Sequence, residues 1–215
     1  MAHALSSSAG HKPLANANDR TVAFYDADPE SYSRGTLDND LSDLYPGLLK
    51  HVRPGGLVLD AGSGSGRDIR EFLSRGYRVE AFDASVGMAG LASRLTGVDV
   101  KVARFEEWSS PAGCYDGIWC FASLLHVAHE DLPGVVSKLA KALRPDAPLF
   151  ASFKRGDGET VDERGRHYTN LTVDTARRLF ASVPGLAVER VWQDDGPTGL
   201  GGRTSWVYVL AVRTG

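Results

Sequence analysis

The chain contains few cysteines and no long apolar run. These two absences argue against a disulfide-rich secreted protein and against a membrane-spanning protein. Cys114 and Cys120 are its only cysteines in 215 residues, too few for a disulfide framework. Both lie in apolar surroundings, so we expect reduced thiols. No segment approaches the run of about eighteen apolar residues that a membrane-spanning helix needs, and residues 1–20 lack the apolar core of a signal peptide. These absences predict a soluble, cytoplasmic protein without a membrane partner.

The chain also lacks an excess of basic charge and any spacing typical of metal ligands. Its formal net charge is -3 and its pI is about 6.1. Because phosphate contacts supply most of the affinity for nucleic acids, long DNA or RNA is not an expected partner, although a compact RNA with a local basic patch stays open. His126, His129 and the two cysteines show no metal-ligand spacing, so we expect no metal site. The residues do not determine an oligomeric state.

The composition indicates one globular domain: 42% of the residues are hydrophobic and 24% are charged. Residues 1–20 are rich in Ser, Ala and Asn without periodicity, and we expect a disordered tail there. The single domain then covers 21–215, with a helical cap over 21–52. A polar segment without clear structure, 154–170, is longer than an ordinary connection, and such loops are often functional. We therefore interpret 154–170 as a substrate lid.

Apolar runs typical of buried strands alternate with amphipathic stretches typical of helices. This alternation predicts an α/β fold, a doubly wound and mostly parallel sheet with helices on both faces. The last two strands are joined by a short glycine-rich connection, which indicates a final antiparallel hairpin. The expected strands are 57–61, 78–82, 98–103, 115–121, 149–153, 187–192 and 205–212.

The most informative segment is LDAGSGSG at 59–66, between a strand pattern and a helix pattern. Gly62, Gly64 and Gly66 stand at every second position, where either a strand or a helix would lose stability. A tight turn that lets backbone approach a ligand explains them, and ligands of α/β proteins bind at such turns. A purely structural turn is the alternative, but such turns ordinarily need one glycine.

Spacing around this turn discriminates between nucleotides. A dinucleotide fingerprint needs its third glycine at position 67, where this chain has Arg67. Asp60 before the turn repels a pyrophosphate but attracts an ammonium group, and Asp83, which ends the next strand, can accept hydrogen bonds from ribose hydroxyls. Either acid can instead cap the helix that follows it. A ligand with a ribose, an ammonium and no pyrophosphate is S-adenosylmethionine.

The run VLDAGSGSGRDIREFLSRGYRVEAFDAS resembles motif I and the following acidic strand end of the class I S-adenosylmethionine-dependent methyltransferases. The resemblance extends from about Tyr25 to Arg213, and within the superfamily the chain looks most like small bacterial enzymes of the type 11/type 12 group, which includes tellurite-resistance-type relatives. It implies a Rossmann-like seven-stranded sheet of order 3-2-1-4-5-7-6. It also implies a cofactor-binding set, in which Glu107 is an alternative to Glu106 for the adenine amine: Asp60, Gly62, Ser63, Gly64, Gly66, Asp83, Ala84, Phe105, Glu106 and Phe121.

The residues for catalysis and for the methyl acceptor are harder to assign. His126 follows the fourth strand, where cofactor and acceptor meet, and its ordinary pKa suits a general base; a histidine that shapes the site or caps a helix is the alternative. Candidate acceptor contacts flank the N-terminal helix, the expected lid and the final hairpin: Tyr25, Lys154, Tyr168 and Arg203.

These residues predict an enzyme that transfers a methyl group from S-adenosylmethionine to a small-molecule acceptor through an O, N or oxyanion nucleophile, by in-line displacement. Because the positive sulfur activates the methyl group, the protein mainly positions the reactants. A tellurite- or selenite-type oxyanion acceptor, a protein that binds S-adenosylmethionine without catalysis, and a Rossmann dehydrogenase are the alternatives.

Overall fold

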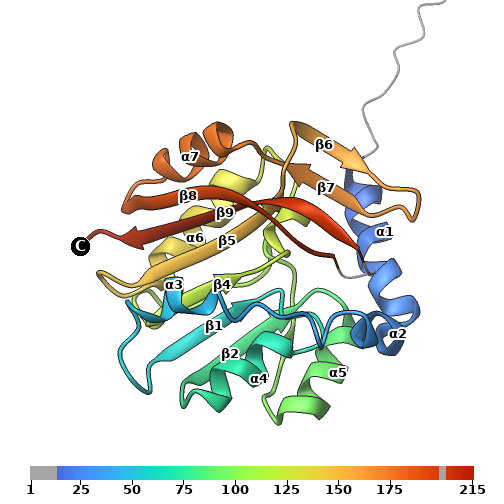
Figure 1. The fold of residues 1–215 in the computed structure, drawn as a ribbon, viewed down its shortest axis with the longest axis horizontal. Helices are drawn as coiled ribbons and strands as arrows, with labels where there is room; N and C mark the ends of the chain where they lie inside the picture. The colour runs from blue at the N-terminus through green and yellow to red at the C-terminus, as the bar shows by residue number, and fades with distance from the viewer. Residues whose placement is uncertain (1–13, 199–201) are drawn as a thin grey trace, which may run out of the picture.

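The computed structural model describes residues 14–198 and 202–215. Its centre is a seven-stranded sheet of order β3-β2-β1-β4-β5-β9-β8 (Figure 1). The five strands up to β5 are parallel, whereas β9 runs antiparallel to both of its neighbours, β5 and β8. The strands of this sheet are β1 (Leu57–Ala61), β2 (Arg78–Asp83), β3 (Lys101–Val102), β4 (Gly117–Cys120), β5 (Pro148–Lys154), β8 (Leu186–Pro197) and β9 (Arg203–Arg213).

This order is the predicted 3-2-1-4-5-7-6 arrangement, because the two strands between β5 and β8 lie outside the main sheet. The central strands β4 and β5 are buried along nearly their whole length, as expected for strands covered on both faces. The expected strand at 98–103 is reduced to two residues at the edge of the sheet. The doubly wound fold class is therefore confirmed, with that strand shortened.

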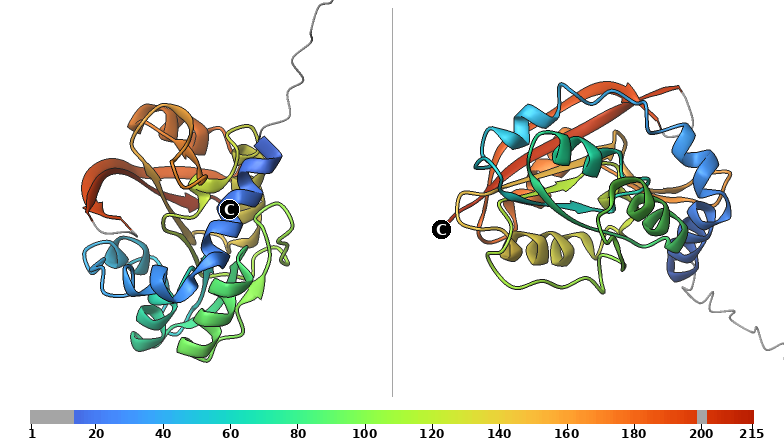
Figure 2. Two further views of the ribbon diagram at one scale, coloured as in Figure 1. Left: turned by 90° about the vertical axis from the view of Figure 1, so that its right-hand side faces the viewer. Right: turned by 90° about the horizontal axis from the view of Figure 1, so that it is seen from below.

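Helices cover both faces of the sheet. Figure 2 shows α3 (Tyr45–Leu49) and α4 (Arg67–Ser74) on one face and α6 (Leu132–Ala142) on the other. Helix α7 (Val173–Ala181) packs beside α6, and α5 (Val86–Thr96) packs beside α4. The largest buried side chains lie between these layers, where the Trp119 ring stacks on the Phe150 ring at a centroid distance of 4.1 Å. This packed core fixes the ends of the strands, and those ends position the site.

The N-terminal prediction needs correction. Helix α1 (Leu14–Ala27) begins inside the segment expected to be a disordered tail, so that expectation is wrong for residues 14–20, while residues 1–13 lie outside the described residues. The helix forms there because it packs against α5 and against the strand β7 (His167–Asn170), contacts that no local pattern announces. A short helix α2 (Pro29–Arg34) follows, and the expected cap over 21–52 is helical only in part.

The segment 154–170, expected to lack structure, contains a β-hairpin. Strand β6 (Gly158–Val161) pairs antiparallel with β7, in a register that places Gly158 opposite Asn170. All four residues of β7 are buried although they are polar or amphipathic. Their burial is tolerated because partners satisfy them: the Thr169 hydroxyl donates to the Val127 carbonyl, and the His167 amide donates to the Thr21 hydroxyl. The apolar alternation that signals a strand was therefore missing from the sequence.

Candidate functional site

A cavity of about 390 Å³ opens at the carboxyl ends of the parallel strands, under α1 and the β6–β7 hairpin. Its size is within the range of small-molecule sites. The glycine turn after β1 and the end of β2 form one part of its wall, and aromatic and basic side chains from α1, β5 and β7 form another. We call the first part the cofactor half and the second part the acceptor half.

The glycine turn has the backbone shape that the sequence predicted. The backbone φ angles of Gly62, Gly64 and Gly66 are 78°, 54° and 84°. Residues with a side chain rarely adopt such positive φ angles. A Cβ atom at Gly62 would lie 2.4 Å from the Ser123 Cβ, so no larger residue fits. Gly62 and Gly64 line the cavity, and a Cβ at Gly64 would meet no atom within 4 Å. The turn therefore leaves open space beside its own backbone.

Gly66 packs against a neighbouring helix. It does not line the cavity. A Cβ at this position would lie 3.0 Å from Thr96 Cγ2 and 3.1 Å from Ala92 Cβ, both on α5. Gly66 therefore allows α4 and α5 to approach each other, and direct cofactor contact at Gly66 stays a prediction.

Asp83 is held at the end of β2 by the turn itself. Its carboxylate accepts from the Gly64 amide at 2.8 Å and from the Ser85 amide at 2.9 Å. Burial raises the pKa of Asp83, and these two amide donors oppose the rise. A carboxylate oxygen can accept more than one hydrogen bond, so Asp83 keeps acceptor capacity toward the cavity that it lines.

Two buried oxygens at the turn are unsatisfied. Ser63 Oγ and Asp60 Oδ2 have no hydrogen-bond partner within the described part of the chain. Asp60 is 2% exposed and lies beneath the turn rather than in the cavity wall. Burial raises the pKa of Asp60 well above its ordinary value, and the nearby Asp68 adds to the rise. Because unpaired buried polar atoms are costly, a polar ligand at this turn would be favoured by a hydrogen bond to Ser63 Oγ, which lies in the cavity wall.

The remaining residues predicted for the cofactor, Ala84, Phe105, Glu106 and Phe121, all line the cavity. Glu106 is exposed. Lys138 donates to its backbone carbonyl at 2.8 Å. Phe105 packs edge-on against Phe82 at 5.1 Å between centroids. These residues therefore share one cavity with Asp83, and their contact with an adenosine group stays a prediction.

Arg67 is a cavity residue that the sequence reasoning missed. Its guanidinium binds Asp68 through Nε at 2.7 Å and Nη2 at 2.9 Å, and it lies 5.1 Å from the centre of the Phe121 ring. Asp68 also accepts from Tyr45 and Trp119, which join α3 and β4 to α4. Burial opposes the charge on Asp68, but Arg67 and these donors hold its pKa below the ordinary value. The only signal in the sequence was an arginine where a dinucleotide site has glycine.

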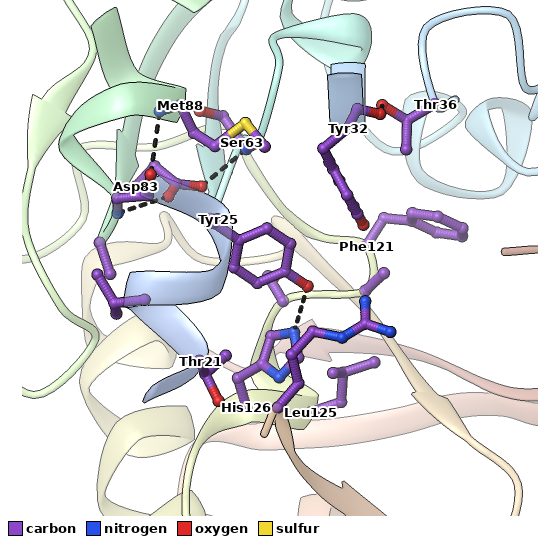
Figure 3. A pocket seen from close by; sticks show the side chains of 18 of the residues that line it. Thr21, Tyr25, Tyr32, Thr36, Ser63, Asp83, Met88, Phe121, Leu125 and His126 are labelled. Atoms are coloured by element: carbon purple, nitrogen blue, oxygen red, sulfur yellow. Dashed lines mark hydrogen bonds between the residues drawn. The ribbon is translucent and has the colours of Figure 1, made fainter. Parts of the chain in front are cut away.

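His126 is engaged within the protein rather than free in the cavity. Its Nδ1 lies 2.6 Å from the His167 carbonyl, which only accepts, so Nδ1 carries the proton and donates. In the neutral ring Nε2 is then the acceptor, and it accepts a hydrogen bond from the Tyr25 hydroxyl at 2.9 Å (Figure 3). Burial lowers the pKa of His126 to about 3, and the neighbouring Arg166 contributes. The geometry makes His126 a neutral acceptor that orients Tyr25.

The acceptor half contains three of the four residues predicted for it: Tyr25, Lys154 and Tyr168 line it. Figure 3 shows the Tyr25 ring between Asp83 and His126, so α1 reaches both halves. Arg203 does not line the cavity; its guanidinium donates to the Asp195 carbonyl on β8, so the prediction of an acceptor contact there is not supported. Tyr32, Arg166 and Trp206 also line the cavity.

The described residues form neither a metal-ligand cluster nor a membrane-spanning helix. Within 14–198 and 202–215, no group of three or more His, Cys, Asp or Glu side chains is arranged to hold a metal ion. In the same part of the chain, no helix has the length and apolar character to cross a membrane. Both cysteines are free thiols.

Comparisons with known proteins agree with this geometry. A family model described as a methyltransferase domain matches residues 58–146. The malonyl-[acyl-carrier protein] O-methyltransferase of Serratia marcescens is 30% identical over 173 residues, which are 80% of this chain and 62% of that protein. The chain therefore spans less than two thirds of the length of this relative.

Solved structures share the fold. The 1,6-didemethyltoxoflavin-N1-methyltransferase of Burkholderia thailandensis, with bound S-adenosylhomocysteine, has a TM-score of 0.73 and 21% identity, over 97% of this chain and 94% of that one. A SAM-dependent methyltransferase from Methanosarcina mazei has a TM-score of 0.71 and 17% identity, over 80% and 98%. Residues 58–146 thus match the methyltransferase domain model, and the chain shares the fold of these two solved methyltransferases.

Proposed function

We propose that this chain transfers the methyl group of S-adenosylmethionine to a small-molecule acceptor. The observation that carries the proposal is one continuous cavity with two unlike halves. The cofactor half combines the glycine turn, the unsatisfied Ser63 hydroxyl and the Asp83 carboxylate, which suit the methionine and ribose groups. The acceptor half has aromatic walls, which suit a small organic molecule.

In this proposal each half has a distinct task. Asp83 accepts hydrogen bonds from the ribose hydroxyls, and Ser63 donates to the methionine end. When bound, S-adenosylmethionine supplies an electrophilic methyl group on a positive sulfur, so the chain's own residues need only align the acceptor and exclude water. Tyr25, which lies between the halves, closes the cavity over the reacting atoms. The β6–β7 hairpin covers the acceptor half, a role close to the lid proposed for 154–170.

The lowered pKa of His126 and its occupied Nε2 favour alignment over general base catalysis. Its Nε2 already accepts from Tyr25, and a proton on it would be disfavoured by burial and by Arg166. We therefore propose His126 as a positioning residue, in place of the base that its sequence position suggested.

The test is a binding and turnover experiment with the purified protein. Calorimetry is expected to give saturable binding of S-adenosylmethionine and none of NAD. Incubation with methyl-labelled cofactor and a small-molecule extract is expected to produce labelled products and S-adenosylhomocysteine in equal amounts. Binding without any turnover would favour a non-catalytic binding protein, and binding of NAD alone would contradict the proposal. A cytoplasmic location stays a prediction.

A further inference from the structure

The basic residues that line the cavity are paired, with two exceptions. Arg67 binds Asp68, Arg104 binds Asp19 at 2.6 Å, and Arg166 binds Asp162 at 2.7 Å. Arg164 is exposed at the rim. Lys154 is half-buried in the acceptor half, and within residues 14–198 and 202–215 no carboxylate lies within 4.0 Å of its amine. Lys154 is therefore the cation of this cavity wall that is withdrawn from water without a counterion.

The surroundings of Lys154 are aromatic. Its Nζ lies 3.5 Å from the centre of the Tyr168 ring, a cation–π contact. The Tyr168 ring lies in turn 5.0 Å from the His126 ring, which places Lys154 in the same group of side chains as the Tyr25–His126 pair. A ring face compensates a desolvated ammonium less completely than a carboxylate does. The site is thus arranged for an anion that the described chain does not itself provide.

The position of Lys154 in the sheet and the charge beside it also indicate a site for an anion. Lys154 is the last residue of β5, so a central strand fixes its backbone at the carboxyl edge of the sheet where ligands bind. Burial lowers the pKa of Lys154, and repulsion by the nearby Arg166 lowers it further, although the Asp162 charge opposes this change in part. An anion would relieve this repulsion. It would also complement the positive sulfonium of the cofactor.

The acidic residues that line the cavity do not pair with Lys154. Asp68 is occupied by Arg67, Asp83 faces the glycine turn, and Glu106 follows β3 beside Phe105. Asp162, the acid nearest this region, is bound by Arg166 through two nitrogens. The acceptor half is consequently net positive. An acceptor with an ammonium group would meet repulsion there, and a neutral acceptor would leave Lys154 unpaired.

We propose that the methyl acceptor is a small organic anion whose carboxylate or other oxyanion group pairs with Lys154. This inference rests on the proposed methyltransferase function and narrows its substrate class. The aromatic walls contact the body of the acceptor, and Lys154 sets its orientation. The acceptor's charge, rather than its size alone, then determines which molecules are methylated.

The first test separates acceptors by charge. A small-molecule extract is divided at neutral pH on an anion exchanger into a retained fraction and a flow-through fraction, and each is incubated with enzyme and methyl-labelled S-adenosylmethionine. Labelled product is expected from the retained fraction. Product from the flow-through fraction alone overturns the inference but leaves the methyltransferase function standing. Product from neither, with cofactor binding intact, overturns the proposed function and the inference with it.

The second test asks whether Lys154 supplies the recognition. With the acceptor purified from the retained fraction, Lys154→Met is expected to raise its KM about tenfold or more, the effect of losing one charge-assisted hydrogen bond. The KM for S-adenosylmethionine is expected to stay unchanged, and Lys154→Arg is expected to restore most of the acceptor affinity. Arg155→Met is the matched control, because it removes a charge from the neighbouring, exposed residue outside the cavity. An unchanged acceptor KM in Lys154→Met overturns the inference.

Discussion

The Tyr25 hydroxyl donates to Nε2 of His126 at 2.9 Å, and this bond joins the N-terminal helix to the segment that follows β4. The two residues are 101 positions apart in the chain. A second hydrogen bond holds α1 at the same place. The backbone amide of His167, whose carbonyl contacts His126, donates to the hydroxyl of Thr21, one turn earlier on α1. The helix α1 is thereby attached over the cavity by polar bonds as well as by packing.

The first prediction concerns this bond. Tyr25→Phe removes the donor and leaves a buried ring nitrogen unsatisfied, so the free energy of unfolding is expected to fall by about 1–3 kcal/mol. Urea denaturation measures the change. Tyr77→Phe is the control, since Tyr77 is half-buried and its hydroxyl makes no hydrogen bond within the described residues. Equal effects of the two substitutions would show that the Tyr25–His126 bond contributes nothing.

A second prediction follows from the lowered pKa of His126. The folded protein holds this ring neutral down to about pH 3, whereas the unfolded chain binds a proton near pH 6.5. Between these values the unfolded state binds more protons, so the contribution to stability is complete above pH 6.5 and declines as the pH falls. We expect the native protein to lose about 2 kcal/mol more than His126→Asn between pH 6.5 and 5. Thermal unfolding at both pH values measures the difference; parallel losses would contradict it.

Asp83 provides a third prediction, on ligand binding. Asp83→Ala is expected to weaken S-adenosylmethionine binding by about 1–3 kcal/mol, because hydrogen bonds to a buried polar ligand are lost. Calorimetric titration measures this value. The control is Asp99→Ala, which removes an acid whose side chain is 80% exposed and lies outside the cavity. Unchanged affinity in Asp83→Ala would mean that the ribose contact is wrongly assigned.

The fourth prediction distinguishes two glycines of the same turn. Gly66→Ala inserts a methyl group between α4 and α5 at a positive φ, and we expect a loss of stability of about 2 kcal/mol or more. Gly64→Ala meets open space in the protein alone, so its stability cost is expected to be smaller, on the order of 1 kcal/mol. Because Gly64 lines the cavity, its substitution is expected to weaken cofactor binding as well. Melting curves with and without S-adenosylmethionine test both; a larger cofactor effect at Gly66 would reverse the assignment.

Local patterns were sufficient for the sheet and for the cofactor half. The glycine turn, Ser63 and Asp83 are adjacent to strands that the sequence identifies, so their meeting at one edge follows from parallel topology alone. The packing role of Gly66 could not be predicted in this way. Its role depends on the side chains of α5, some thirty residues later, and glycine spacing carries no information about which atoms will face the missing Cβ.

By itself, the sequence determined the α/β architecture and the glycine turn, because hydrophobic periodicity and turn chemistry act over short distances along the chain. The strand order followed from the resemblance to a known family, and S-adenosylmethionine was predicted from the residues around the turn. Only the tertiary structure decided that α1 and a polar hairpin close the cavity, that His126 is a neutral partner of Tyr25, and that Lys154 lacks a counterion. Those properties depend on burial and on neighbours far apart in the chain. Desolvation and pairing of charges arise only when the fold brings such residues together.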